Sequence, residues 1–213
     1  MKLLIAIPAM DSMPVDTVRC LLDLTRKLQS QGVDYETRIE AGTLVHLARD
    51  RLAKYAIIHK FTHVLWLDSD MIFTDELLDD LQFCGKPFVT GIAHGRRKPF
   101  LSCLFKSYYP EVVRWTYNEY PSRAFEVAAC GFAAVLIETQ ILNDVLQRYN
   151  TCFLPTQFLS EDVAFCDRAR TLGYHVYAEP GVKLGHIGRM IVYPEDSLHG
   201  NSDISNYEEV IDK

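Results

Sequence analysis

The sequence lacks an apolar run long enough to cross a membrane. The longest apolar stretch, Leu3–Met10, is far shorter than the roughly 20 residues that a transmembrane helix needs, and it contains Pro8. Asp11 follows it directly, without the small-residue cleavage site of a signal peptide. We therefore interpret this stretch as a buried first strand and expect no transmembrane segment.

The sequence also lacks paired cysteines. Its six cysteines are scattered and form no CxxC motif, which argues against a zinc ribbon and against a dithiol redox centre. Several lie within apolar segments, where a free thiol behaves as a small hydrophobic group. We therefore expect a reduced, cytoplasmic setting.

Basic residues are in the minority. The 213 residues include 22 Lys and Arg against 28 Asp and Glu, a formal net charge of −6. This balance, without a long basic run, argues against general nucleic-acid binding. A phosphate-bearing small molecule stays possible, because a local basic pocket or a bound cation can override the net charge.

Apolar periodicity predicts alternating strands and helices over the first 92 residues. Strands are expected at 3–7, 34–39, 63–67 and 87–92, with helices at 15–31, 43–59 and 75–83. Further helices are expected at 139–149 and 161–172, and a last strand at 174–178. This order predicts an α/β fold whose mostly parallel sheet is flanked by helices. We expect one domain over residues 1–194, followed by an acidic, loosely ordered tail over residues 195–213.

The middle of the chain breaks the alternation. Residues 99–120 are aromatic and irregular, and residues 125–137 resemble strand material interrupted by Cys130 and Gly131. We expect a small aromatic-rich β insertion here. Its aromatic rings could stack on an acceptor sugar, or they could form a hydrophobic arm or a dimer contact.

The strongest local motif is the pair of acids in VLWLDSDMIF, residues 64–73. A buried strand delivers Asp68 and Asp70 to its carboxyl end, the sheet edge at which α/β proteins bind ligands. Such carboxylates suit a hard divalent cation or a ribose hydroxyl. The alternative is an Asp-Ser-Asp turn that only starts the next helix.

Two later motifs carry further candidates. Glu161 or Asp162, in the first turn of a helix after Ser160, could be a general base, or could simply favour the helix dipole. His186 lies in the glycine-rich segment 181–188, where the backbone can approach a ligand closely, and with two carboxylates it would suit a Mn²⁺-like ion.

Two basic features have less specific interpretations. Arg49 lies on a helix flank, where it could be solvated, paired with Asp50, or in reach of a phosphate or base edge. The basic segment 94–98 could be a solvated loop or could attract an anionic donor or acceptor.

Taken in order, these motifs resemble a compact glycosyltransferase of the GT-A fold, of the family-2-like kind found in bacteria and phages. The resemblance runs from residue 1 to about residue 190, and the segments that carry it are 5–8, 48–50, 67–71, 129–132, 160–162 and 185–186. One departure is Asp50, which stands where many similar sequences carry asparagine. The chain is also short for this fold, which is compatible with a small acceptor, a partner subunit or a homo-oligomer.

The resemblance implies a nucleotide-sugar donor, a hydroxyl acceptor and Mn²⁺ or Mg²⁺, with UDP the favoured nucleotide and GDP the next. It implies that Asp70 and His186 hold the metal, with Asp68 near the metal or the ribose. It implies that Asp162, or Glu161, is the base of an inverting transfer. The implied nucleotide-sugar contacts are Pro8, Ala9, Asp11, Arg49, Asp68, Ser69, Cys130 and Gly131.

Three other functions compete with this interpretation. A haloacid-dehalogenase-type phosphatase would use Asp68 as nucleophile, but it normally carries its DxD near the start and a later GDxxxD, which is absent here. A nucleotidyltransferase usually has a basic glycine-rich loop after the first strand, and residues 8–12 contain no basic residue. A non-catalytic nucleotide-sugar-binding protein would keep both aspartates without a productive base.

Overall fold

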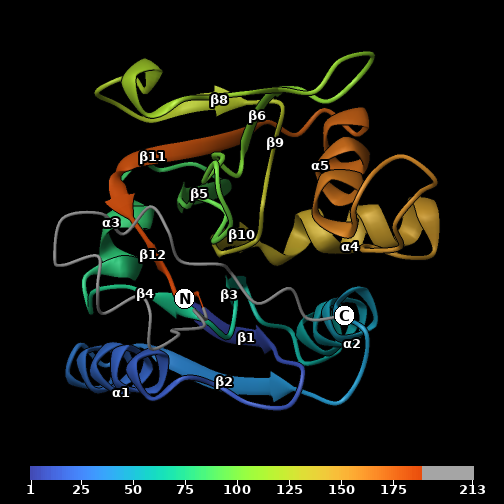
Figure 1. Ribbon diagram of the computed structural model, residues 1–213. Coiled ribbons are helices and arrows are strands. Elements are labelled where there is room, and N and C mark those ends of the chain that lie inside the picture. Colours follow the sequence, from blue (N-terminus) through green and yellow to red (C-terminus); the bar gives the residue numbers. More distant parts are fainter. Residues whose placement is uncertain (189–213) are drawn as a thin grey trace, which may run out of the picture.

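The computed structural model describes residues 1–188 and has a seven-stranded central sheet in the order β2-β1-β3-β10-β5-β11-β8 (Figure 1). Its strands are β1 (Lys2–Pro8), β2 (Asp34–Glu40), β3 (His63–Leu67), β5 (Phe88–Ile92), β8 (Phe125–Val127), β10 (Ala134–Glu138) and β11 (Val176–Lys183). Strands β10 and β8 run opposite to the other five. The predicted α/β sheet is confirmed as mixed and mostly parallel. The predicted tail, residues 195–213, lies outside the described residues.

Helices cover both faces of the sheet, as the alternation predicted. Figure 1 shows α1 (Val15–Ser30) and α3 (Leu77–Phe83) on one face, with α2 (Val45–Ile58), α4 (Thr139–Tyr149) and α5 (Glu161–Thr171) on the other. Helix α1 buries Leu21, Leu24 and Leu28, which recur at helical spacing and so lie on one stripe. Gly32 ends this segment with a positive φ of 69°, a conformation that favours glycine.

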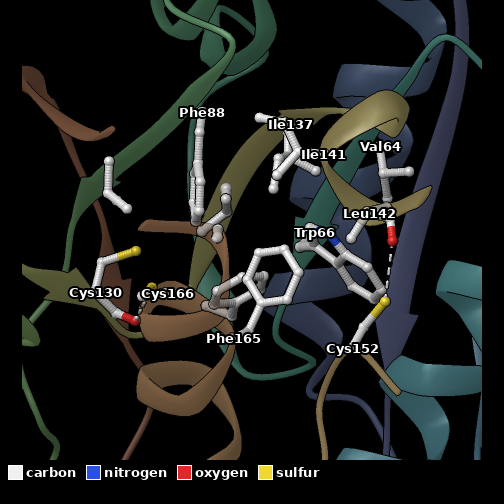
Figure 2. Packing of buried hydrophobic residues seen from close by; sticks show 14 of the residues in the cluster. Val64, Trp66, Phe88, Cys130, Ile137, Ile141, Leu142, Cys152, Phe165 and Cys166 are labelled. Carbon is white, nitrogen blue, oxygen red and sulfur yellow. Dashed lines mark hydrogen bonds between the residues drawn. The ribbon is translucent and has the colours of Figure 1, made fainter. Parts of the chain in front are cut away.

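Each face of the sheet has its own apolar core. Side chains of β1, β3 and β10 alternate between the two cores, because neighbouring residues of a strand point to opposite faces. The larger core lies under α2, α4 and α5 and is rich in aromatic rings. Figure 2 shows Trp66, Phe88 and Phe165 in it, and the thiol of Cys166 donating to the carbonyl of Cys130. All six cysteines are free.

The aromatic insertion is a small antiparallel sheet of β7 (Val113–Arg114), β6 (Leu104–Ser107) and β9 (Ala129–Cys130), with a 3₁₀ turn at Tyr117–Glu119. Its rings divide into two groups. Trp115 packs on Phe125 with ring centroids 4.7 Å apart, and it joins the edge of the larger core. Tyr109 and Tyr117 are exposed. Part of the insertion is therefore ordinary core.

A two-stranded ladder closes the carboxyl end of β3. Strand β4 (Met71–Ile72) pairs with β12 (Gly185–His186), and the Ile187 N–H donates to the carbonyl of Asp70 at 2.9 Å. A Cβ on Gly185 would lie 3.0 Å from the Ile72 Cβ. The close approach at Gly185 is thus to a neighbouring strand, and it brings His186 beside the aspartates that follow β3.

Within residues 1–188, no helix is both long enough and apolar enough to span a membrane.

Candidate functional site

A cavity of about 420 Å³ opens at the carboxyl ends of β1 and β3, which is a usual size for a small-molecule site. Its charged lining is acidic in balance, since five carboxylates face three guanidinium groups. The carboxylates are Asp11, Asp68, Asp70, Glu161 and Asp162, and the cations are Arg49, Arg96 and Arg97. The excess of two negative charges favours a cationic ligand or cofactor.

Arg49 lies at the base of this cavity, buried to 3% exposure between two acids. Its Nη2 donates to Asp68 and its Nη1 to Glu161, both at 2.7 Å. It is therefore neither solvated nor paired with Asp50, as the sequence had left open. It joins the end of β3 to the start of α5.

One guanidinium cannot fully neutralise two carboxylates. Burial raises the pKa of Asp68 and of Glu161, and the charge of Arg49 only partly opposes that rise. The same two carboxylates outweigh the burial of Arg49 and raise the pKa of its guanidinium. The neighbouring carboxylate of Asp162 also raises the pKa of Asp68 and of Glu161.

Asp70 lies on the other side of the cavity and has two basic neighbours. Its Oδ2 lies 2.5 Å from Arg96 Nη1 and 3.3 Å from His186 Nε2. Burial favours the protonated form, but the His186 hydrogen bond and the two positive charges lower the pKa of Asp70. The hydrogen bond to Asp70 raises the pKa of His186.

The ring orientation of His186 suits a metal ligand. Its Nδ1 lies 2.9 Å from the carbonyl oxygen of His94, which can only accept, so Nδ1 carries a proton. In the neutral ring Nε2 then presents a lone pair toward Asp70, an arrangement that needs a proton or a metal cation between them. Metal-binding histidines are commonly oriented by such a carbonyl. Asp70 and His186 therefore fit a divalent metal.

The third predicted metal ligand is not positioned with them. Across residues 1–188, no three His, Cys, Asp or Glu side chains are arranged closely enough to hold a metal ion. Asp68 instead bonds to Arg49, and one oxygen of Asp70 bonds to Arg96. Asp68 acts here as an ion-pair partner, and the remaining sites around a metal would belong to a ligand or to water.

Asp162 presents one oxygen toward the insertion. Its Oδ1 accepts from the hydroxyl of Ser160 and from the Val163 N–H, whereas its Oδ2 lies 3.6 Å from the position of a Cβ on Gly131. Ser160 directly precedes α5, but its side chain does not cap the helix, because its hydroxyl donates to Asp162 instead. Glycine at 131 leaves the space in front of Oδ2 open.

Only some of the other predicted nucleotide-sugar contacts line the cavity. Asp11 and Ser69 line it, whereas Pro8, Ala9 and Cys130 are buried and do not. The side chain of Cys130 lies in the larger core, where burial raises the pKa of its thiol well above the usual value. Gly131, the next residue, is the one that lies next to Asp162.

Several cavity residues escaped the sequence reasoning. Met10, Ser12, Pro14 and Val45 line the wall without belonging to a recognisable motif, whereas Gly188 ends the glycine-rich segment 181–188. The role of His94 as a backbone acceptor was equally invisible, since any residue can supply a carbonyl. The basic segment 94–98 did signal Arg96 and Arg97, but not the ion pair with Asp70.

Comparisons with known proteins support the fold. No protein-family model matches the sequence, and no curated protein sequence matches it. Among solved structures, A197 from STIV is 20% identical with a TM-score of 0.62, over 92% of this chain and 91% of that one. A structure of GalNAc-T7 with UDP, GalNAc and Mn²⁺ has a TM-score of 0.53 at 10% identity. This chain aligns over 87% of its length with 44% of that longer chain.

These similarities show the fold and not the chemistry. The protein has a compact fold like that of GT-A glycosyltransferases, as the sequence motifs implied.

Proposed function

We propose that this protein is a metal-dependent glycosyltransferase, which moves a sugar from a UDP-sugar to a hydroxyl acceptor with inversion at the anomeric carbon. The observation that carries the proposal is the Asp70–His186 pair at the cavity wall, with His186 oriented through the His94 carbonyl. Asp162 lies in the same cavity with one oxygen directed toward Gly131. The UDP and Mn²⁺ held by GalNAc-T7 motivate our choice of nucleotide and metal.

Asp70 and His186 would hold the metal, with Asp11 and Ser69 among the contacts to the nucleotide. A divalent ion, when bound, stabilises the negative charge that develops on the diphosphate leaving group. Arg49 donates to both Asp68 and Glu161 and is itself buried, so in this proposal it positions the site rather than contacting phosphate.

Asp162 would act as the general base. The acceptor hydroxyl attacks the anomeric carbon, its proton passes to Asp162, and the bond from that carbon to the diphosphate oxygen breaks. Glu161 is less suited to this role, because Arg49 holds its carboxylate at 2.7 Å. A phosphatase with Asp68 as nucleophile is also disfavoured, because Arg49 holds an oxygen of that carboxylate too.

Calorimetric titration tests the donor site. UDP and GDP are titrated with and without Mn²⁺ into the wild type, Asp70→Ala and the control Asp23→Ala, an exposed acid of α1 that pairs with Arg26. We expect metal-dependent binding of UDP that Asp70→Ala abolishes and Asp23→Ala retains. Absence of nucleotide binding by the folded wild type would refute the proposal.

Activity is tested separately. Hydrolysis of UDP-sugars by the wild type, screened by release of UDP, is expected to require Mn²⁺ and Asp162. Metal-dependent UDP binding together with inertness toward every donor and acceptor would instead identify a non-catalytic nucleotide-sugar-binding protein.

A further inference from the structure

The guanidinium of Arg96 pairs with Asp70, the carboxylate that would bind the metal under the proposed function. Its Nη1 lies 2.5 Å from Asp70 Oδ2, the same oxygen that His186 faces. The hydrogen bond from Arg96 uses one lone pair of Oδ2, and its positive charge repels a cation at the same carboxylate. Arg96 therefore competes with a metal ion for Asp70.

The position of Arg96 allows that displacement. It lies near the tip of a hairpin-like turn, in which Gly95 N–H donates to the Leu101 carbonyl and Phe100 N–H to that of Arg97. Its side chain is 45% exposed, so the ion pair is of the weak, solvated kind. Below the tip, His94 is fixed through its carbonyl to His186, so the turn keeps its place while the Arg96 side chain moves.

A displaced Arg96 would remain in the cavity. Both Arg96 and Arg97 line it, and a Cβ on Gly188 would lie 3.7 Å from the Arg96 Cβ, so Gly188 is close to the base of the Arg96 side chain. The ligand class whose charge and geometry suit a freed guanidinium beside a metal is a diphosphate.

We propose that Arg96 is a displaceable cation, which holds Asp70 when no metal is bound and moves to the diphosphate of the nucleotide when metal takes its place. This inference rests on the proposed function. Its consequence is cooperativity: the nucleotide attracts the arginine that competes with the metal, so each ligand strengthens the binding of the other.

The test measures Mn²⁺ binding without nucleotide, by the electron paramagnetic resonance signal of free Mn²⁺, and then UDP binding at saturating Mn²⁺. The variants are Arg96→Gln, Arg96→Lys and the matched control Arg97→Gln. Arg97 lines the same cavity, and among residues 1–188 the structure records no contact between it and Asp70. Thermal unfolding checks that each variant is folded.

For Arg96→Gln we expect Mn²⁺ alone to bind about threefold more tightly, because the competing cation is gone. We expect UDP at saturating Mn²⁺ to bind about tenfold more weakly, because a charge-assisted hydrogen bond is lost. Arg96→Lys keeps the charge and should stay close to the wild type for Mn²⁺ alone. Arg97→Gln should not alter the affinity for Mn²⁺ alone.

Two negative outcomes can be distinguished. If Mn²⁺ and UDP bind the wild type and need Asp70, but Arg96→Gln binds Mn²⁺ no more tightly than the wild type, the inference about Arg96 is wrong and the proposed function stands. If Asp70→Ala and the wild type behave alike toward Mn²⁺ and UDP, the proposed function itself fails.

Discussion

Replacing Arg49 with methionine should destabilise the fold by about 3 kcal/mol at pH 8, because it leaves two carboxylates without a counter-charge. Methionine keeps an apolar stem of similar reach, so the change removes charge with little loss of volume. Asp68 and Glu161 would then face each other without the guanidinium between them, with Asp162 nearby.

The magnitude follows from burial. Removing one partner of a buried ion pair costs about 3–5 kcal/mol. Arg49 is 3% exposed, but the side chains of Asp68 and Glu161 are 31% and 19% exposed, so water in the cavity screens them and places the cost at the lower end. The guanidinium also lies 5.2 Å from the centre of the Phe132 ring, a contact that methionine replaces only in part.

The loss of stability caused by Arg49→Met should depend on pH, and the direction of the pKa shifts determines whether it grows or shrinks as the pH rises. In the wild type, burial already raises the pKa of Asp68 and Glu161 against the effect of Arg49. Without Arg49 both pKa values rise further above those of the unfolded chain, so the variant's fold holds protons more tightly than the unfolded chain does. Its stability therefore recovers as the pH falls and declines as the pH rises through the raised pKa values.

Urea unfolding at pH 5 and pH 8 measures this difference for Arg49→Met against the wild type. Arg51→Met is the matched control, since Arg51 lies on the same helix, is 59% exposed and pairs with Glu40 at 2.8 Å. The control should cost under about 1 kcal/mol. A cost for Arg49→Met below about 1 kcal/mol, or one equal at both pH values, would refute the ion-pair argument.

Three further predictions concern single side chains. Asp162→Asn should abolish sugar transfer while UDP binding by calorimetry persists, whereas Glu161→Gln should retain measurable transfer; equal loss in both variants would contradict the assignment of the base. Burial raises the pKa of Cys103 to about 11, so its alkylation, followed by mass spectrometry, should stay slow at pH 8 and accelerate toward pH 11; fast reaction at pH 8 would contradict this. Asp50→Ala should lower the free energy of unfolding by about 2 kcal/mol, because the N–H groups of Cys152 and Phe153 lose their acceptor. An unchanged urea midpoint would show that these hydrogen bonds do not stabilise the fold.

Apolar periodicity predicted most elements of the fold to within two residues. The strand at 63–67 and the helix at 139–149 match at both ends, because a buried run and a one-sided stripe define them. The direction of β10 was not predictable in this way. It follows β9 of the insertion rather than a helix, so the rule for helical crossovers does not set its direction.

The order of the acidic motifs along the chain predicted that they meet at one edge of the sheet. It did not predict which side chains they pair with. His186 meets Asp70 across 116 positions through the pairing of β12 with β4, two strands of two residues each. Strands this short leave no periodic signal. The sequence therefore indicated which acidic residues share the cavity, but not that Arg96 pairs with Asp70.

Burial of Arg49 was detectable in principle. Arg49, Leu52, Ala53 and Ala56 stand at positions i, i+3, i+4 and i+7 of α2, and all four are buried. Leu44 and Leu47, at the start of the same segment, are exposed and lie outside this stripe. A charged residue in an otherwise apolar stripe is a signal of a buried ion pair, since an unpaired guanidinium there would be too costly.

Asp50, the next residue on α2, shows why its departure from asparagine matters. One residue further along a helix turns the side chain by about 100°, away from the cavity and toward the loop that precedes α5. Its Oδ1 accepts from the N–H groups of Cys152 and Phe153 at 2.9 and 2.7 Å, and its Oδ2 from the Thr151 hydroxyl at 2.6 Å. Asparagine offers one acceptor oxygen where the carboxylate uses two. Arg49 and Asp50 thus hold the start of α5 and the loop before it from a single helical turn, and the position of Asp162 depends on both.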